Sequence, residues 1–250
     1  MAVDAVLAYA TAVAQEVMTA SDGSMQAAYL HGSAVLGGWR PASDVDMLFV
    51  VAGRTSASAL ASIARVLAAR SDRSGGCPGR GLECSVVHAT AAEAPRAPWP
   101  YLLHVVGEPA GCRIQDGADS PGDADLIMHY AVCRAAGHAL TGPAPCDVIG
   151  QVPRQTILSY LADELSWGLQ HAPEAYAVLN ACRARVYMMD DEIVSKIAGG
   201  AAALHRGFAP AELIMRALSQ QRGRAAGQQP GDDAVEFVRQ TAAALLQAAG

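Results

Sequence analysis

The chain has 250 residues, a formal net charge of -6 and a hydrophobic content of 52%. This length allows one or two domains, and the apolar fraction is sufficient for a core built mainly from Ala, Val and Leu, because aromatic residues make up only 5%. The acidic balance argues against a dedicated nucleic-acid-binding protein, since such proteins carry basic patches.

Features of secreted and membrane proteins are missing from the sequence. No stretch approaches the roughly 18 uninterrupted apolar residues of a membrane span. The first twenty residues lack a basic start and contain Asp4 and Glu16, which argues against a secretory signal. The six cysteines form no C-x-x-C pair, so we expect reduced thiols and neither a zinc site nor disulfides. We therefore predict a cytoplasmic monomer that binds neither a membrane nor a nucleic acid.

The first part of the chain alternates between helical and strand patterns. Apolar positions at three- and four-residue spacing predict helices, and shorter apolar runs predict strands. The predicted helices span 3–20, 55–70 and 126–140, with a short helical turn at 34–37. The predicted strands span 27–30, 44–52 and 82–88. Segments 71–81 and 94–100, rich in Ser, Gly, Pro and Arg, predict loops.

The remainder of the chain has helical patterns only. These helices are predicted over 154–170, 175–198, 209–220 and 231–249, with breaks at polar, Pro or Gly clusters such as Gly199-Gly200. The switch in pattern predicts an α+β fold: a domain at 1–150 with a small mixed β-sheet and helices, followed by an α-helical bundle domain at 151–250.

One motif in the first domain points to phosphate and metal chemistry. The sequence Leu30-His31-Gly32-Ser33-Ala34 places a glycine and a hydroxyl at a strand-to-helix junction, where backbone N–H groups favour an anion such as a triphosphate. After a ten-residue gap, Asp44 and Asp46 open an apolar strand. Because side chains alternate along a strand, both carboxylates point the same way.

Such a carboxylate pair favours a divalent cation. Mg²⁺ takes oxygen ligands from one or two carboxylates together with phosphates, and Glu83 on the later strand is placed to complete the set. The alternative is a solvated strand end, but two acids before an otherwise apolar strand fit a metal better. We therefore predict that Asp44, Asp46 and Glu83 hold Mg²⁺.

This combination resembles the nucleotidyltransferase superfamily of the DNA polymerase β type. The segment HGSAVLGGWRPASDVDMLFVV is similar in particular to the start of the aminoglycoside adenylyltransferases that modify streptomycin and spectinomycin, and the similarity continues at a lower level over nearly the whole chain. LECSVVH, HALTGP and LNACRARVYMMDDEIVSKIAGGAAAL carry it further. The resemblance implies an N-terminal nucleotidyltransferase domain, a C-terminal helical domain, ATP as co-substrate and Mg²⁺.

The resemblance also implies roles for individual residues. Glu83 is expected to be the catalytic base. The residues expected to bind nucleotide are Gly32, Ser33, Ser43 and Lys196, the last being the only lysine beside 17 arginines. Trp167 and Glu174 are expected to line the acceptor pocket. Arg183 and Arg185 are expected to form ion pairs with Asp190, Asp191 or Glu192, the alternative being a lining of the triphosphate channel.

Two departures from the family leave the acceptor open. The loop after Trp167, residues 168–176, is about three residues shorter and retains only Glu174 as an acid, and a second substrate-facing Trp is replaced by Pro109. The predicted function is transfer of AMP from Mg-ATP to a hydroxyl of an aminoglycoside or aminocyclitol antibiotic, spectinomycin or streptomycin, with release of pyrophosphate. The alternatives are an adenylyltransferase with another small-molecule or protein acceptor, or a nucleotide-sensing module without activity.

Overall fold

The computed structural model describes residues 2–108 and 111–250. The chain divides into two compact units, one ending at Val152 and the other spanning Pro153–Gly250. The sequence-based boundary was 150/151. Pro109, which stands where the resemblance leads us to expect a second substrate-facing Trp, lies outside the described residues. In the part of the chain that is described, no helix is long and apolar enough to cross a lipid bilayer.

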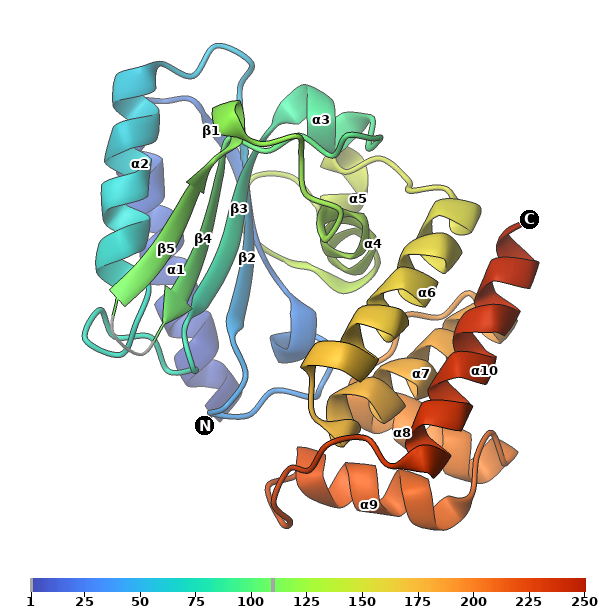
Figure 1. Ribbon diagram of the computed structural model, residues 1–250. Coiled ribbons are helices and arrows are strands. Elements are labelled where there is room, and N and C mark those ends of the chain that lie inside the picture. Colours follow the sequence, from blue (N-terminus) through green and yellow to red (C-terminus); the bar gives the residue numbers. More distant parts are fainter. Residues whose placement is uncertain (1, 109–110) are drawn as a thin grey trace. The chain divides into compact units, whose positions relative to one another are not determined.

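The first unit is built on a mixed sheet of six strands in the order β5-β4-β3-β2-β1-β6 (Figure 1). The strands are β1 Met25–His31, β2 Val45–Val51, β3 Leu82–His88, β4 Leu103–Glu108, β5 Gly111–Asp116 and β6 His138–Thr141. The central strands β2 and β3 are parallel, and the other neighbours are antiparallel. The predicted α+β class with a small mixed sheet is therefore confirmed.

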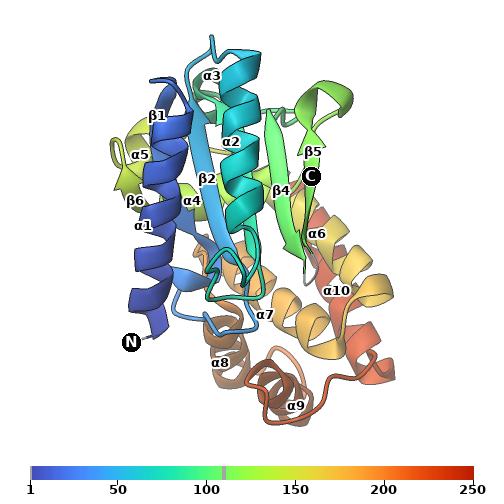
Figure 2. The same ribbon diagram turned by 90° about the vertical axis from the view of Figure 1, so that its left-hand side faces the viewer.

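Helices cover both faces of this sheet. Figure 2 shows α1 (Ala2–Ala20) and α2 (Ala57–Arg70) side by side on one face, whereas α4 (Leu126–Ala136) packs against β1 on the other. Ser56 caps α2 by accepting a hydrogen bond from the N–H of Ala59 at 3.1 Å, as its sequence pattern predicts. Shorter helices are η1 Gly32–Ala34, α3 Ala89–Glu93, η2 Gly117–Asp119 and α5 Pro145–Val148.

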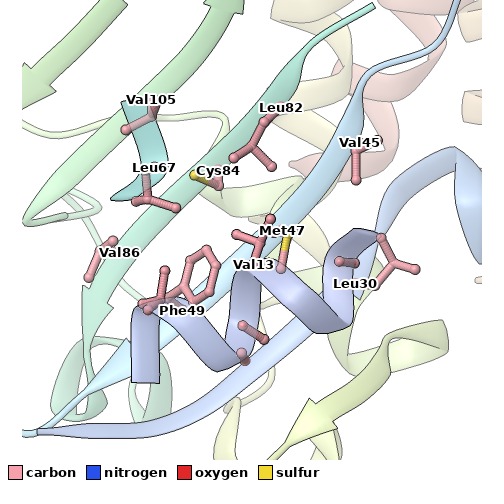
Figure 3. Close-up of a cluster of buried hydrophobic side chains, with 14 of the residues drawn as sticks. Val13, Leu30, Val45, Met47, Phe49, Leu67, Leu82, Cys84, Val86 and Val105 are labelled. Atoms are coloured by element: carbon pink, nitrogen blue, oxygen red, sulfur yellow. The ribbon is translucent and has the colours of Figure 1, made fainter. Parts of the chain in front are cut away.

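The main core of this unit lies between the sheet and helices α1 and α2. Met47 and Phe49 of β2 and Cys84 of β3 project into it beside Val13 of α1 and Leu67 of α2 (Figure 3). Because side chains alternate along a strand, the residues between them point to the opposite face. The same alternation that buries Met47 and Cys84 therefore directs Asp46 and Glu83 away from the core.

The second unit consists of five helices, α6 Arg154–His171, α7 Glu174–Asp190, α8 Lys196–Arg206, α9 Ala211–Gln221 and α10 Asp232–Ala249. Helix α10 packs along α6 and α7, and α8 and α9 pack against α7 and against each other. The central α7 is buried over most of its length and contributes small residues such as Ala177, Ala181 and Ala184. This unit has the helical architecture that the sequence predicts.

The structure corrects the predicted elements in several places. The predicted helix 126–140 ends at Ala136, and His138–Thr141 forms the edge strand β6 beside β1. The predicted helix 175–198 is interrupted, because Asp191 adopts a left-handed conformation and Ser195 starts α8 by capping the N–H of Ala198.

The Gly199-Gly200 pair, predicted to break a helix, lies inside α8. A Cβ atom on Gly199 would stand 2.9 Å from the backbone of Arg183, and one on Gly200 would stand 2.7 Å from Leu218. The two glycines therefore allow α8 to approach α7 and α9 closely, and tertiary packing outweighs their low helix propensity.

Candidate active site

The carboxylates predicted to bind metal lie on one row of the sheet. Asp46 of β2 pairs in register with Glu83 of the parallel strand β3, and with His31 of β1 on its other side. Paired residues on adjacent strands project to the same face. Asp44 directly precedes β2, two residues before Asp46, and its negative charge acts on Glu83. The structure thus brings the three predicted acids to one end and one face of the β2–β3 pair.

The predicted glycine turn lies directly against this row. Gly32 follows β1 with φ +66°, a left-handed conformation that favours glycine. A Cβ atom at this position would collide with the carboxylate of Asp46. Gly32 is therefore required both by the turn and by the close approach of one of the predicted metal ligands.

The two predicted serines flank the same region. The hydroxyl of Ser33, in the turn η1, is buried and has no hydrogen-bond partner among the described residues. The Ser43 hydroxyl accepts a hydrogen bond from the N–H of Arg40 at 3.2 Å, and its carbonyl accepts one from the N–H of Arg80 at 2.9 Å. Ser33 thus has an unused polar group beside the turn, whereas Ser43 shapes the entry into β2.

Glu83 has the electrostatic setting of a proton acceptor. Burial raises the pKa of its carboxyl group, and the negative charge of Asp44 raises this pKa further. A carboxylate is a better base when its pKa moves up toward neutrality. Glu83 thus lies beside Asp46 and has a raised pKa. These two properties together are typical of functional carboxylates.

Asp44 is held by an arginine that sequence analysis did not single out. The Arg80 guanidinium donates two hydrogen bonds to the Asp44 carboxylate, from Nε at 2.9 Å and from Nη2 at 2.5 Å. Arg80 comes from the loop before β3, where the sequence pattern gave only a turn-rich segment. No signal in the sequence connects it with Asp44, 36 positions earlier.

The three acids fit Mg²⁺ by donor type and by the sheet face that they share. In the arrangement described for residues 2–108 and 111–250, no three carboxylate, imidazole or thiol groups are close enough together to hold a metal ion. Asp44 faces Arg80 instead. The chemistry of the ligand set is therefore present, with one of its members engaged by a guanidinium.

In the second unit, Tyr176 contacts two predicted residues, Lys196 and Trp167, although sequence analysis did not identify Tyr176 itself. The Lys196 ammonium at the start of α8 lies 4.2 Å from the ring centroid of Tyr176 on α7. Trp167 on α6 meets the same tyrosine edge-on, at 6.1 Å between ring centroids, and stacks on His171 at 5.1 Å. Tyr176 also donates a hydrogen bond to Glu164. We call Glu164, Trp167, His171, Tyr176 and Lys196 the aromatic cluster.

The aromatic cluster includes an exposed platform. Trp167 exposes 49% of its surface, which is unusual for a large aromatic side chain on an amphipathic helix and fits the predicted contact with a ligand. An aromatic ring below an ammonium attracts it electrostatically. Tyr176 therefore holds Lys196 and supports Trp167, and only its position two residues after Glu174 in the shortened loop could have drawn attention to it.

Glu174 lies in a different setting from the predicted substrate pocket. Its carboxylate is fully buried and accepts hydrogen bonds from Arg216 at 2.7 and 3.0 Å and from the side chains of Gln220 and Gln228. Burial by itself would raise the pKa of Glu174, but the bonds from Arg216 and Gln228 outweigh it and lower this pKa. With no exposed oxygen left for an ammonium, Glu174 connects α7 to α9 as a structural residue.

The two arginines of α7 also differ from expectation. Arg185 donates a hydrogen bond to Thr241 at 2.9 Å and lies over the ring of Phe237 at 5.2 Å, so it packs α7 against α10. The acids expected to pair with it bind other arginines, Asp190 to Arg206 and Asp191 to Arg154. Arg183 has a buried Nε without a hydrogen-bond partner among the described residues.

Comparisons with known proteins agree with the fold described above. Residues 147–247 match the family described as aminoglycoside adenylyltransferase, C-terminal domain. Among solved structures, the chain is similar to spectinomycin adenyltransferase AAD(9) from Enterococcus faecialis, solved with ATP and spectinomycin. That similarity has a TM-score of 0.64 and 16% sequence identity, and it covers 95% of this chain and 97% of the other. No curated protein sequence matches this chain.

Proposed function

We propose that this chain is an adenylyltransferase that transfers AMP from Mg-ATP to a hydroxyl group of an aminocyclitol antibiotic. The match of residues 147–247 to the aminoglycoside adenylyltransferase C-terminal domain and the fold shared with spectinomycin adenyltransferase AAD(9) support this proposal. Spectinomycin is the first candidate acceptor. The single observation that carries the proposal is the row formed by Asp46 and Glu83 in register, with Gly32 against it and Asp44 at its end.

In this function, the N-terminal unit performs the chemistry. Asp44, Asp46 and Glu83 would hold Mg²⁺, which when bound neutralises the charge on the phosphates. Glu83 accepts the proton of the attacking hydroxyl, because burial and the charge of Asp44 make it more basic than an ordinary glutamate. The Gly32-Ser33 turn offers its backbone and the Ser33 hydroxyl to the nucleotide phosphates.

The C-terminal unit has binding groups of its own. Lys196 offers a positive charge to a phosphate group, and Tyr176 holds that charge in place. Trp167 offers an exposed ring to the acceptor. Because Glu174 is buried and fully bonded, recognition of a cationic acceptor does not depend on it, which favours a compact aminocyclitol over streptomycin.

The proposal is tested by incubating the protein with Mg-ATP and spectinomycin and measuring the mass of the drug. We expect an adduct of one AMP and an equal amount of pyrophosphate. Glu83→Gln should lower turnover by about 10²–10⁴-fold with near-normal nucleotide binding. Wild-type turnover by this variant would refute the role of Glu83 as the base.

The alternative keeps the reaction and changes the acceptor. It is favoured by segment 168–176, which the sequence predicted as a loop but which runs from the end of α6 into the start of α7, and whose only acid is the buried Glu174. A panel of streptomycin, other aminoglycosides and small hydroxylated amines distinguishes the two. Transfer to a panel member without transfer to spectinomycin would establish the alternative, and nucleotide binding without pyrophosphate release on any acceptor would refute both.

A further inference from the structure

The Arg80–Asp44 ion pair occupies the face on which the proposed metal ligands meet. Both Oδ atoms of Asp44 accept from the guanidinium, so each oxygen has one lone pair engaged by Arg80, and a cation that approaches Asp44 meets the positive charge of Arg80. That charge also acts on Glu83 and Asp46. One guanidinium therefore interacts with all three acids.

The position of Arg80 does not depend on its side chain. The N–H of Arg80 donates to the carbonyl of Ser43 at 2.9 Å, and the N–H of Val45 donates to the carbonyl of Gly81 at 2.9 Å. These reciprocal backbone bonds attach the loop before β3 to the segment before β2. The loop thus keeps the side chain of residue 80 beside Asp44 whether or not the ion pair is made.

The ion pair is placed where its partners can exchange. The Arg80 side chain is 63% exposed, so water can hydrate the guanidinium when it leaves Asp44, and its two bonds to the carboxylate are what a cation has to replace. A divalent cation brings twice the charge and favours carboxylate oxygens. Exchange of the guanidinium for a cation at Asp44 is therefore accessible without rearrangement of the fold.

From this geometry we infer that Arg80 is a resident counter-ion that holds Asp44 until a divalent cation replaces it. The inference rests on the proposed function, since it takes Asp44, Asp46 and Glu83 as the cation's ligands. Arg80 touches no reacting atom in this role: its guanidinium binds both carboxylate oxygens of Asp44 and competes there with the cation.

The first test measures binding of Mn²⁺ by electron paramagnetic resonance in the absence of nucleotide. Because a competitor is removed, we expect Arg80→Gln to bind Mn²⁺ roughly three- to tenfold more tightly than the wild type. Arg113→Gln is the matched control, since Arg113 is an exposed arginine of the same unit that pairs with Glu108 at 3.6 Å and not with Asp44. Thermal unfolding confirms that each variant is folded.

A double variant separates competition from a general charge effect. If Arg80 acts through Asp44, Arg80→Gln produces no gain in Mn²⁺ affinity in an Asp44→Asn background. A gain that persists in this background would overturn the inference, because it would show a long-range effect on Asp46 and Glu83. Equal or weaker Mn²⁺ binding by the single Arg80→Gln variant would overturn it as well.

A spectroscopic readout follows the exchange in the wild-type protein. The readout is the NMR resonance of the Arg80 Hε proton, which is assigned by its loss in Arg80→Lys. As Mg²⁺ is added, this resonance should shift and the proton should exchange faster with water, because Nε releases Asp44. An unchanged resonance at saturating Mg²⁺ would refute the exchange. A wild type that binds no Mn²⁺ with or without ATP would instead refute the metal-dependent function itself, so the two failures are distinguishable.

Discussion

The buried carboxylate of Glu174 allows a quantitative test of what holds the helical unit together. Glu174 is 0% exposed and takes two hydrogen bonds from Arg216, which also pairs with the exposed Asp233 at 2.9 Å. Replacing Arg216 by Met keeps much of the side-chain volume and removes the charge. The carboxylate is then left in a buried site with only Gln220 and Gln228 as side-chain donors.

The expected cost at neutral pH is about 3 kcal/mol. Removing one partner of a buried ion pair typically costs about 3–5 kcal/mol, because the other charge remains without compensation. We take the lower end since Arg216 is 35% exposed and two amide donors remain. Asp233→Asn is the control: it breaks only the exposed half of the network and should cost about 0–1 kcal/mol.

The deficit of Arg216→Met should depend on pH. In the wild type the pKa of Glu174 is lowered, so its stabilisation is present above the unfolded-state pKa and is lost as pH falls through the folded-state pKa. Without Arg216, burial raises that pKa, and the charged form destabilises the fold at pH 7. Because protonation removes this penalty, the deficit should shrink toward pH 4.

Hydrogen exchange of the amides in α7 and α9 measures the free energy of opening in this unit alone. The measurement compares wild type, Arg216→Met and Asp233→Asn at several pH values. A deficit below 1 kcal/mol for Arg216→Met, or one that stays constant between pH 7 and pH 4, would refute the argument that Glu174 is a buried anion held by Arg216.

Three further substitutions test the active site and the aromatic cluster. Gly32→Ala should reduce turnover at least tenfold, measured by pyrophosphate release, because its Cβ displaces Asp46 and the φ of +66° disfavours alanine. Tyr176→Leu should raise the KM for ATP about three- to tenfold because the ring below Lys196 is lost, whereas Tyr176→Phe keeps the ring and should leave the KM unchanged. Equal KM values for the two variants would refute the contact between Tyr176 and Lys196. Ser195→Ala should lower the free energy of unfolding by about 1 kcal/mol in urea titrations, and no change would refute its cap on α8.

Local patterns predicted the elements that carry the chemistry. The strand that begins after Asp44 and the strand that contains Glu83 are recognisable because each is a short segment rich in apolar residues, as buried central strands are. Strands β4 and β5, with the sequences LHVVGE and GCRIQD, were not predicted because they follow a Pro-rich segment. They are stabilised by pairing of β4 with β3 and of β5 with β4, which a local pattern does not reveal. Strand β6 was missed for the same reason, because its residues continue the helical pattern of 126–140 and its partner is β1.

The residues that sequence analysis missed act through contacts between distant positions. Arg80 meets Asp44 because of backbone bonds between two loops. Glu174 was expected to face a substrate since it is the only acid in its loop, and its partner Arg216 lies 42 positions later. Gly199 was interpreted as a break although it is a site of helix contact. None of these partners can be inferred from the local pattern of either residue alone.

Two glutamates show how the surroundings of a charge separate structural from functional roles. Glu174 is buried among donors, its pKa is lowered, and its charge is neutralised by Arg216. Glu83 lies near charged and titratable groups, among them Asp44 and Arg80, and burial together with the charge of Asp44 raises its pKa. The first arrangement stabilises the folded chain as it is, whereas the second is unfavourable until a cation or a proton arrives. Carboxylates whose pKa is raised in this way cluster at functional sites, which is why we assign the proposed reaction to Glu83 and not to Glu174.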